Sequence, residues 1–266
     1  MRKFGVAVLA AAIVGSVWAD GVEYKLDKPA DWVPNGKVKW VGEKKNIMEV
    51  TGSAMLVSAK KFNIDPKKLI ELEADVKMIS GKPATTYFGF RVIGKDGKYI
   101  NASSVNAVPG GETVLVKAVK PGDKSITVKA NNKWKKSSIA YVVINAKKDL
   151  SDLPNTSFIG HNITDVKNEG ANMVVTFKRA FNLAAPAGTA VRMHHDGGYM
   201  YAGGIKYIGA DSGMVEFKGK VRGMVKSGMT GSGWAPGTVK AELIMLVNWG
   251  VAGSVTQIKD VEMEIK

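Results

Sequence analysis

Short runs of apolar residues, many of them alternating with polar residues, recur along most of the chain. The runs span roughly 5 to 8 positions, and Gly, Pro, Asn and Asp separate them at short intervals. Val and Ile, which favour the pleated backbone of a strand, are frequent within the runs. Alternation with a period of two places one face of a strand against a core, and closely spaced turns join such strands antiparallel. The pattern therefore predicts an all-β protein, an antiparallel β-sandwich or barrel.

The individual runs place the strands, and turn residues such as Asp65-Pro66 and Asn131-Asn132 lie between them. A single short helix is predicted around Lys148–Leu153. The predicted strands are Lys37–Trp40, Ile47–Thr51, Leu69–Met78, Thr85–Ile93, Leu115–Val119, Ser125–Lys129, Ile139–Asn145, Ile163–Lys167, Met173–Lys178, Ala190–His194, Gly213–Val221, Val239–Asn248 and Val255–Ile265.

The first nineteen residues have the pattern of a cleaved secretory signal peptide. Arg2 and Lys3 precede an apolar run over Phe4–Val14, and small residues follow at Val17-Trp18-Ala19. The run is shorter than the roughly 20 apolar residues that a spanning helix needs, and no other stretch of the chain predicts a membrane span. We therefore expect residues 1–19 to be removed, the mature chain to begin near Asp20, and the protein to lie outside the cytoplasm.

Composition narrows the compartment and the partner. The chain has no cysteine, so its fold is held without disulfides, which suits a bacterial periplasm, cell surface or secreted protein. The net charge is +14, but the lysines are scattered in pairs such as Lys44-Lys45 and Lys135-Lys136 at predicted turns and strand ends. Charged strand edges that prevent aggregation explain most of these pairs. No nucleic-acid partner is predicted, and the charge favours an anionic ligand over a neutral one.

Two blocks of the sequence resemble the halves of one domain. "DWVPNGKVKW", "SAMLVSAKKFNIDPKKLIELEADVKMISG" and "TYFGFRVIGKDGKYI" form the first block, and "GMVEFKGKVRG", "WAPGTVKAELIMLVNWG" and "VTQIKDVEMEIK" form the second. Their strand order and alternation resemble carbohydrate-binding modules with a galactose-binding-like jelly roll. The resemblance implies a jelly-roll β-sandwich built from residues 20–101 and 205–266.

The intervening residues 102–204 have different sequence motifs. Motifs such as "PGDKSITV" and "PAGTAV" are similar to those of small β barrels in phage-tail and secreted bacterial proteins. The chain is thus expected to be a jelly roll interrupted by a small β-barrel-like domain, an arrangement that resembles uncharacterised secreted bacterial proteins and carries no established activity.

The stretch "RMHHDGG" contains two of the three histidines, His194 and His195, directly before Asp196. Neighbouring side chains on a strand point to opposite faces, so the two histidines do not easily hold one ion. A metal site needs three or four ligands, and the remaining histidine, His161, lies in a predicted loop. The stretch is therefore interpreted as a polar turn, with an adventitious metal site and a catalytic role as alternatives.

Catalysis has little support in the sequence. No G-x-S-x-G elbow is present, and the lack of cysteine excludes a thiol nucleophile. A glycosidase needs two facing carboxylates, and strand residues such as Glu71 and Glu242 are read more simply as solvent-facing charges.

Aromatic residues of the two jelly-roll blocks are the better candidates for a binding site, because flat rings stack on the apolar faces of sugars. Alternation places Tyr87 and Arg91 on the face opposite the expected core residues Phe88 and Phe90. The alternative is that these aromatics also pack inside. The predicted ligand-binding residues are Tyr87, Arg91, Trp234, Asn248 and Trp249.

The resemblance also implies a structural calcium ion, because such modules often place acidic residues near the first and last strands. Asp260 matches the later position, and Glu23 or Asp20 the earlier one. Calcium takes six to eight oxygen ligands, many of them backbone carbonyls. No other cofactor is predicted.

These observations favour an exported, non-catalytic glycan-binding or surface-interaction module, expected to be monomeric. A structural or assembly protein of the bacterial envelope that binds other proteins is the alternative. A carbohydrate-active enzyme comes third.

Overall fold

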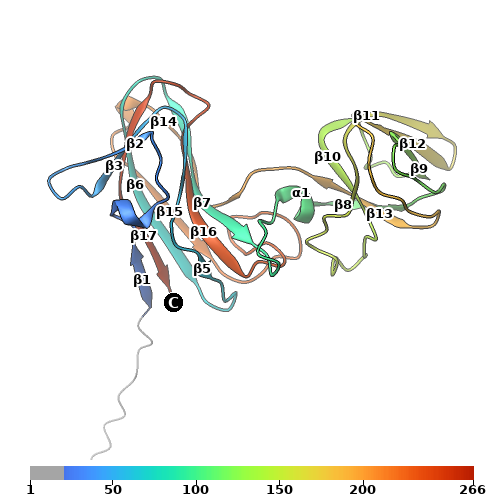
Figure 1. The fold of residues 1–266 in the computed structure, drawn as a ribbon, viewed down its shortest axis with the longest axis horizontal. Coiled ribbons are helices and arrows are strands. Elements are labelled where there is room, and N and C mark those ends of the chain that lie inside the picture. Colours follow the sequence, from blue (N-terminus) through green and yellow to red (C-terminus); the bar gives the residue numbers. More distant parts are fainter. Residues whose placement is uncertain (1–20) are drawn as a thin grey trace, which may run out of the picture.

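The computed structural model describes residues 21–266, so the predicted signal peptide lies outside the described residues. Strands hold 53% of the described residues and helices 4%, which confirms the all-β prediction. All strand pairs between named strands are antiparallel, and they form three sheets, two on one side of the molecule and one on the other (Figure 1). No helix within residues 21–266 has the length and apolar character that crossing a membrane requires.

The first two sheets form a β-sandwich. The first sheet has the order β15-β6-β17-β3-β2, with β1 also paired to β17, and the second has the order β14-β7-β16-β4, with β5 also paired to β16. Their strands are β1 Val22–Lys25, β2 Val38–Val41, β3 Ile47–Thr51, β4 Ala54–Val57, β5 Phe62–Asn63, β6 Ile70–Ser80, β7 Ala84–Ile93, β14 Met200–Ile208, β15 Val215–Val221, β16 Lys240–Trp249 and β17 Val255–Ile265.

The third sheet comes from the segment between β7 and β14 and has the order β8-β13-β10-β11-β12-β9. Short helical turns lie at η1 Pro29–Asp31, α1 Ala102–Val105 and η2 Ala210–Ser212. The strands of the third sheet are β8 Ala107–Val114, β9 Ser125–Lys129, β10 Ser137–Ile144, β11 Phe158–Glu169, β12 Asn172–Phe177 and β13 Ala190–His195.

The buried apolar side chains form two separate clusters. One lies between the first two sheets and includes Val50, Phe88 and Met245. The other lies within the third sheet and draws all of its buried members from residues 115–193. The second sheet resumes at Met200, the start of β14, before the boundary at residue 204 expected from the sequence.

The third sheet is open rather than a closed barrel among the described residues. Its edge strands β8 and β9 approach each other only at one end, where Leu115 forms a bridge with Val128 and the Val116 N–H donates to the Thr127 carbonyl at 2.8 Å. β8 contains Pro109-Gly110-Gly111, and its pairing with β13 is irregular there. Between the pairs Glu112–Arg192 and Ala107–His194, β8 advances five positions while β13 advances two. A proline without an N–H and flexible glycines interrupt the ladder there.

Two local predictions in this segment are wrong. The predicted strand Leu115–Val119 is outside the named strands. Lys148–Leu153 forms turns rather than a helix. Leu150 has a φ of 65° and Leu153 precedes Pro154, and both features oppose a right-handed helix.

β14 crosses from the second sheet toward the first at the edge of the sandwich. Between Met200 and Gly204 its pairing with β7 shifts, so that the chain bulges around Tyr201 and Ala202. A side chain on Gly89 of β7 or Gly219 of β15 would collide with the backbone of this bulge. Glycine at these two positions lets β14 contact both sheets and places Tyr201 beside β7.

A buried polar network joins β13 to the loop after β10. Arg192 is fully buried, forms an ion pair with Asp152 at 2.7 Å, and also donates to the Lys147 carbonyl at 2.9 Å. Its Nε–H donates to His194 Nε2 at 3.0 Å, and His194 Nδ1–H donates to the Ser103 carbonyl of α1 at 2.7 Å. His194 therefore lies in the predicted strand Ala190–His194, and its burial corrects its interpretation as part of a polar turn.

Burial, and to a smaller extent the positive charge of Arg192, lower the pKa of His194 to about 4, against the opposing effects of the bond to Ser103 and the charge of Asp152. In the unfolded chain the same group titrates near 6.5. Between these values the unfolded chain binds the proton more readily than the folded one. The stability that neutral His194 contributes is therefore present above about pH 6.5 and is lost as the pH falls toward 4.

His194→Ala is expected to lower the free energy of unfolding at pH 7 by about 1–3 kcal/mol, because Arg192 Nε–H loses its acceptor in a buried site. The wild type should lose stability between pH 7 and pH 5, and about 2 kcal/mol of this loss should be absent from His194→Ala. Urea unfolding at the two pH values measures both effects. His195→Ala is the control, because the neighbouring side chain is only half-buried. An unchanged pH dependence in His194→Ala would contradict this role.

Candidate functional site

The outer face of the second sheet carries a row of exposed aromatic residues. Thr85 of β7 lies opposite Tyr207 of β14 on one side and Trp249 of β16 on the other. Residues directly opposite in an antiparallel pair point to the same face. Tyr207 is 71% exposed and Trp249 is 47% exposed. The two rings therefore share one face, two strands apart, or about 9.5 Å between their strands.

The next row adds apolar surface beside these rings. Ile205, Tyr87 and Leu246 lie opposite one another on β14, β7 and β16. Ile205 is 56% exposed, whereas Tyr87 is half-buried because the ring of Tyr201 packs against it at 4.7 Å. We call Thr85, Tyr87, Ile205, Tyr207 and Trp249 the aromatic face. Figure 1 shows that its strands β14, β7 and β16 belong to the two-sheet part of the molecule.

Arg91 lies further along β7 on the same side, and its charge is already paired. Its guanidinium donates to one carboxylate oxygen of Glu242 from Nε at 2.9 Å and from Nη2 at 2.6 Å. Tyr99 stacks on the guanidinium at 3.9 Å and directs its hydroxyl to the same carboxylate at 3.2 Å, while Lys61 lies 3.6 Å from it. These interactions fix the side chains of Arg91, Glu242 and Tyr99 at the end of the face. Arg91 therefore presents no unpaired cation to a ligand.

The outer face of the first sheet is different, because ion pairs cover it. Lys218 pairs with Glu216 at 2.8 Å, and Lys220 pairs with Glu71 at 2.5 Å. Hydrogen bonds from Lys220 and Lys266 lower the pKa of Glu71 to about 2. Such a charged face stays in water and resists association with other sheets. The two outer faces of the sandwich therefore differ in chemistry, and the aromatic one is the candidate binding surface.

The structure places Trp234 in the core rather than on a ligand-binding loop. It is fully buried, and its ring lies 5.0 Å from that of Phe90. Its Nε1–H has no hydrogen-bond partner within residues 21–266. The glycine-rich loop that carries it folds inward because the sandwich offers the ring apolar contacts.

Asn248 is also buried, and its side-chain amide donates hydrogen bonds to backbone carbonyl groups. Its φ is 51°, in the left-handed region that asparagine tolerates better than most residues. Its amide donates to the carbonyls of Gly52 and Ser254 at 3.3 and 3.2 Å, and its oxygen accepts from Thr256 at 2.7 Å. The resulting bulge inserts one residue between Leu246 and Trp249 and turns Trp249 to the outer face.

Glu23 and Asp260, two of the residues predicted for calcium, do not come together, and Asp20 lies outside the described residues. Glu23 lies opposite Glu264 on β17, four residues beyond Asp260 and about 13 Å further along the strand. The carboxylate of Asp260 pairs with Lys259 at 2.6 Å. Residues 21–266 hold no group of three or more His, Asp or Glu side chains placed to bind a metal ion.

Of the predicted ligand-binding residues, Tyr87 and Trp249 share the aromatic face, and Arg91 adjoins it. Tyr207 was missed, although Ile205-Lys206-Tyr207 alternates as a strand does.

No protein-family model matches the chain, and searches of curated proteins and of solved structures give no match.

Burial separates the aromatic residues into two classes that stability measurements can distinguish. Trp234→Ala is expected to lower the free energy of unfolding by about 3–5 kcal/mol, because it removes a fully buried ring. Tyr207→Ala combined with Trp249→Ala should change it by less than about 1 kcal/mol, since both rings are largely exposed. Thermal and urea unfolding of the two variants provide the comparison. A large loss in the double variant would mean that the aromatic face is part of the core.

Proposed function

We propose that this chain is an exported, non-catalytic glycan-binding protein whose aromatic face holds the sugar. The observation that carries the proposal is the row of Tyr207, Thr85 and Trp249 on one face of the second sheet, with both rings exposed. Exposed apolar side chains that are grouped on one surface, unlike single ones, are typical of a site that binds a ligand or a partner. The resemblance of the flanking blocks to carbohydrate-binding modules points in the same direction.

Sugar chemistry suits this surface. The apolar C–H faces of pyranose rings stack on Tyr and Trp, while their hydroxyls seek hydrogen bonds from polar side chains at the rim. Tyr207 and Trp249 are separated by one strand, a distance that an extended oligosaccharide can bridge. Thr85 between them supplies a hydroxyl. Loss of Arg2 and Lys3 with the signal peptide lowers the net charge from +14 to +12, which still favours a glycan with acidic groups.

A structural protein of the bacterial envelope is the second candidate. Ile205 is 56% exposed beside the aromatic residues, and a protein partner would cover such an aliphatic side chain as readily as a glycan. The two functions differ in their ligand and not in the surface that they use. An enzymatic role has less support, because Glu242, the buried carboxylate near this face, is neutralised by Arg91.

Trp249→Ala and Tyr207→Ala are each expected to weaken glycan binding by about 1–3 kcal/mol, because each removes one stacking ring. A glycan array on the chain from Asp20 first identifies the sugar class, and calorimetry with that sugar then measures the variants. Ile79→Ala is a matched control, because Ile79 is an exposed apolar residue on the first sheet. Equal losses in all three variants, or no binding to any sugar on the array, would reject glycan binding at this face.

The proposed export has its own test. Protein isolated from the host should begin near Asp20, because the apolar run after Arg2 and Lys3 is expected to direct secretion and cleavage after Ala19. N-terminal sequencing or intact mass of the extracytoplasmic fraction measures the start. A chain in that fraction that still begins at Met1 would contradict the proposed cleavage.

A further inference from the structure

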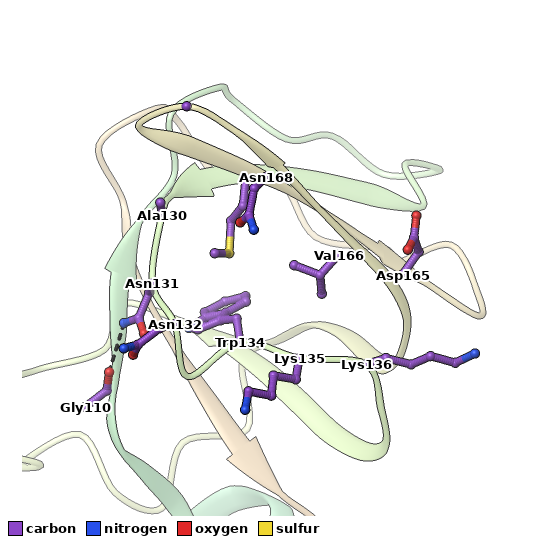
Figure 2. Close-up of a pocket in the computed structure, with 12 residues that line it drawn as sticks. Gly110, Ala130, Asn131, Asn132, Trp134, Lys135, Lys136, Asp165, Val166 and Asn168 are labelled. Atoms are coloured by element: carbon purple, nitrogen blue, oxygen red, sulfur yellow. Dashed lines mark hydrogen bonds between the residues drawn. The ribbon is translucent and has the colours of Figure 1, made fainter.

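The third sheet contains a hollow of about 1130 Å³ that the proposed function does not use (Figure 2). It lies between the loop that joins β9 to β10 and the hairpin of β11 and β12. Figure 2 shows Asn168 and Val166 on one side of the hollow and the segment with Lys135 and Lys136 on the other. The hollow is far larger than a water molecule requires and has the size of a ligand site.

The loop that forms one wall is held in place by its own hydrogen bonds. Trp134 is buried beneath it, and the indole Nε1–H donates to the Gly111 carbonyl at 2.9 Å. Asn131 donates from its amide to the carbonyls of Gly110 and Glu112 at 2.8 and 2.9 Å (Figure 2 marks the first of these bonds). A wall anchored at two positions needs little ordering when a ligand binds.

Four other polar side chains that line the hollow are, in contrast, uncommitted. Within residues 21–266, the side chains of Asn132, Asn168, Lys135 and Lys136 make no hydrogen bond to another residue. Neither of these two lysines has a carboxylate within 4.0 Å in that part of the chain, whereas Lys218 and its neighbours on the first sheet are ion-paired. Amides and free ammonium groups around a pre-formed hollow are hydrogen-bond donors that a ligand with acceptor groups can use.

The surrounding segment also carries excess positive charge. Residues 102–199 contain thirteen Lys and Arg and seven Asp and Glu, a net charge of +6. The one ion pair found within this segment joins Arg192 to Asp152, and it is buried away from the hollow. Asp165 is the single carboxylate that lines the hollow, against two lysines. The local field therefore favours an anion.

We infer that this hollow is a second binding site, which takes an anionic glycan segment. Lys135 and Lys136 would meet the acidic groups, and the amides of Asn132 and Asn168 would bond the hydroxyls. The charge of such a ligand can reside on carboxylate or on phosphate, and the amides suit the hydroxyls of either polymer. The inference is independent of the aromatic face, because none of its residues belongs to the second sheet.

Binding of the chain from Asp20 to polygalacturonate, to its full methyl ester and to phosphorylated dextran tests the site at low and at moderate salt. Lys135→Gln with Lys136→Gln is expected to weaken binding to an acidic polymer by about tenfold. Asp165→Asn should strengthen it, because a repelling charge is removed. Lys147→Gln with Lys148→Gln is the matched control, an exposed lysine pair of the same segment that does not line the hollow, and it should change the affinity less than twofold, roughly the experimental error.

The polymer that loses affinity in the Lys135 and Lys136 variant identifies carboxylate or phosphate as the anion. Equal binding of the methyl ester and the acid would overturn the inference, as would equal losses in the two lysine-pair variants or no binding of either acidic polymer. Tyr207→Ala with Trp249→Ala in the same assay separates this site from the aromatic face. If that variant alone loses binding, the aromatic face is the anionic-glycan site and the hollow is not. If it retains binding that the Lys135 and Lys136 variant loses, the hollow binds whether or not the aromatic face does.

Discussion

The bulge at Asn248 determines that Trp249, the last residue of β16, faces solvent on the second sheet. Asn248 lies on β16, which pairs with β7 on one side and with β4 and β5 on the other. Its amide bonds to Gly52 and Ser254, which flank β3 and β17 of the first sheet. One buried side chain thus links the two sheets. Because a single extra residue reverses the direction of every side chain after it, the same bulge is the reason that Trp249 faces outward instead of entering the core.

The two parts of the molecule are joined by a short polar interface rather than by a shared core. α1 connects β7 to the third sheet, and the Ser103 carbonyl of this helix accepts from His194. On its other side, the carbonyl of Val105 accepts from the hydroxyl of Ser227 and from the N–H of Gly228. The helix is therefore bonded to both parts. His194 can accept from Arg192 only while its ring is neutral, and burial favours this neutral form, whereas the bond to Ser103 that holds the helix opposes the lowering of the pKa.

Alternation of apolar and polar residues was enough to predict most of the strands. β9 and β17 have the predicted bounds, and Phe88 and Phe90 are buried while Tyr87 and Arg91 lie on the opposite face, as expected. The failures share a cause. The sequence records local preference, whereas the bulge of β14 over Gly89 and the burial of Trp234 depend on contacts between residues distant in the chain.

The candidate site was predictable to a similar degree. Trp249 followed from its place at the end of a long strand, but its direction depends on the bulge, which no periodic pattern shows. Tyr207 was not predicted as a site residue, because β14 is glycine-rich and irregular at its start and the strand itself was not predicted. His194 was misjudged for a related reason. Its partners Arg192 and Ser103 belong to a strand and a helix that meet only in the folded chain, and a histidine in a polar sequence gives no sign that it is buried.

The position of the inserted segment gives the two proposed sites a physical relation. The segment leaves the sandwich after β7 and returns at β14, and these two strands are neighbours in the sheet that carries the aromatic face. Its entry is held through α1 by hydrogen bonds on both sides, so the hollow is linked to the sheet by an ordered connection and not by a flexible linker. For a polymer long enough to reach both surfaces, binding at one raises the effective concentration of the polymer at the other. If both proposed sites bind, a long acidic glycan that reaches both would be retained more firmly than its short fragments.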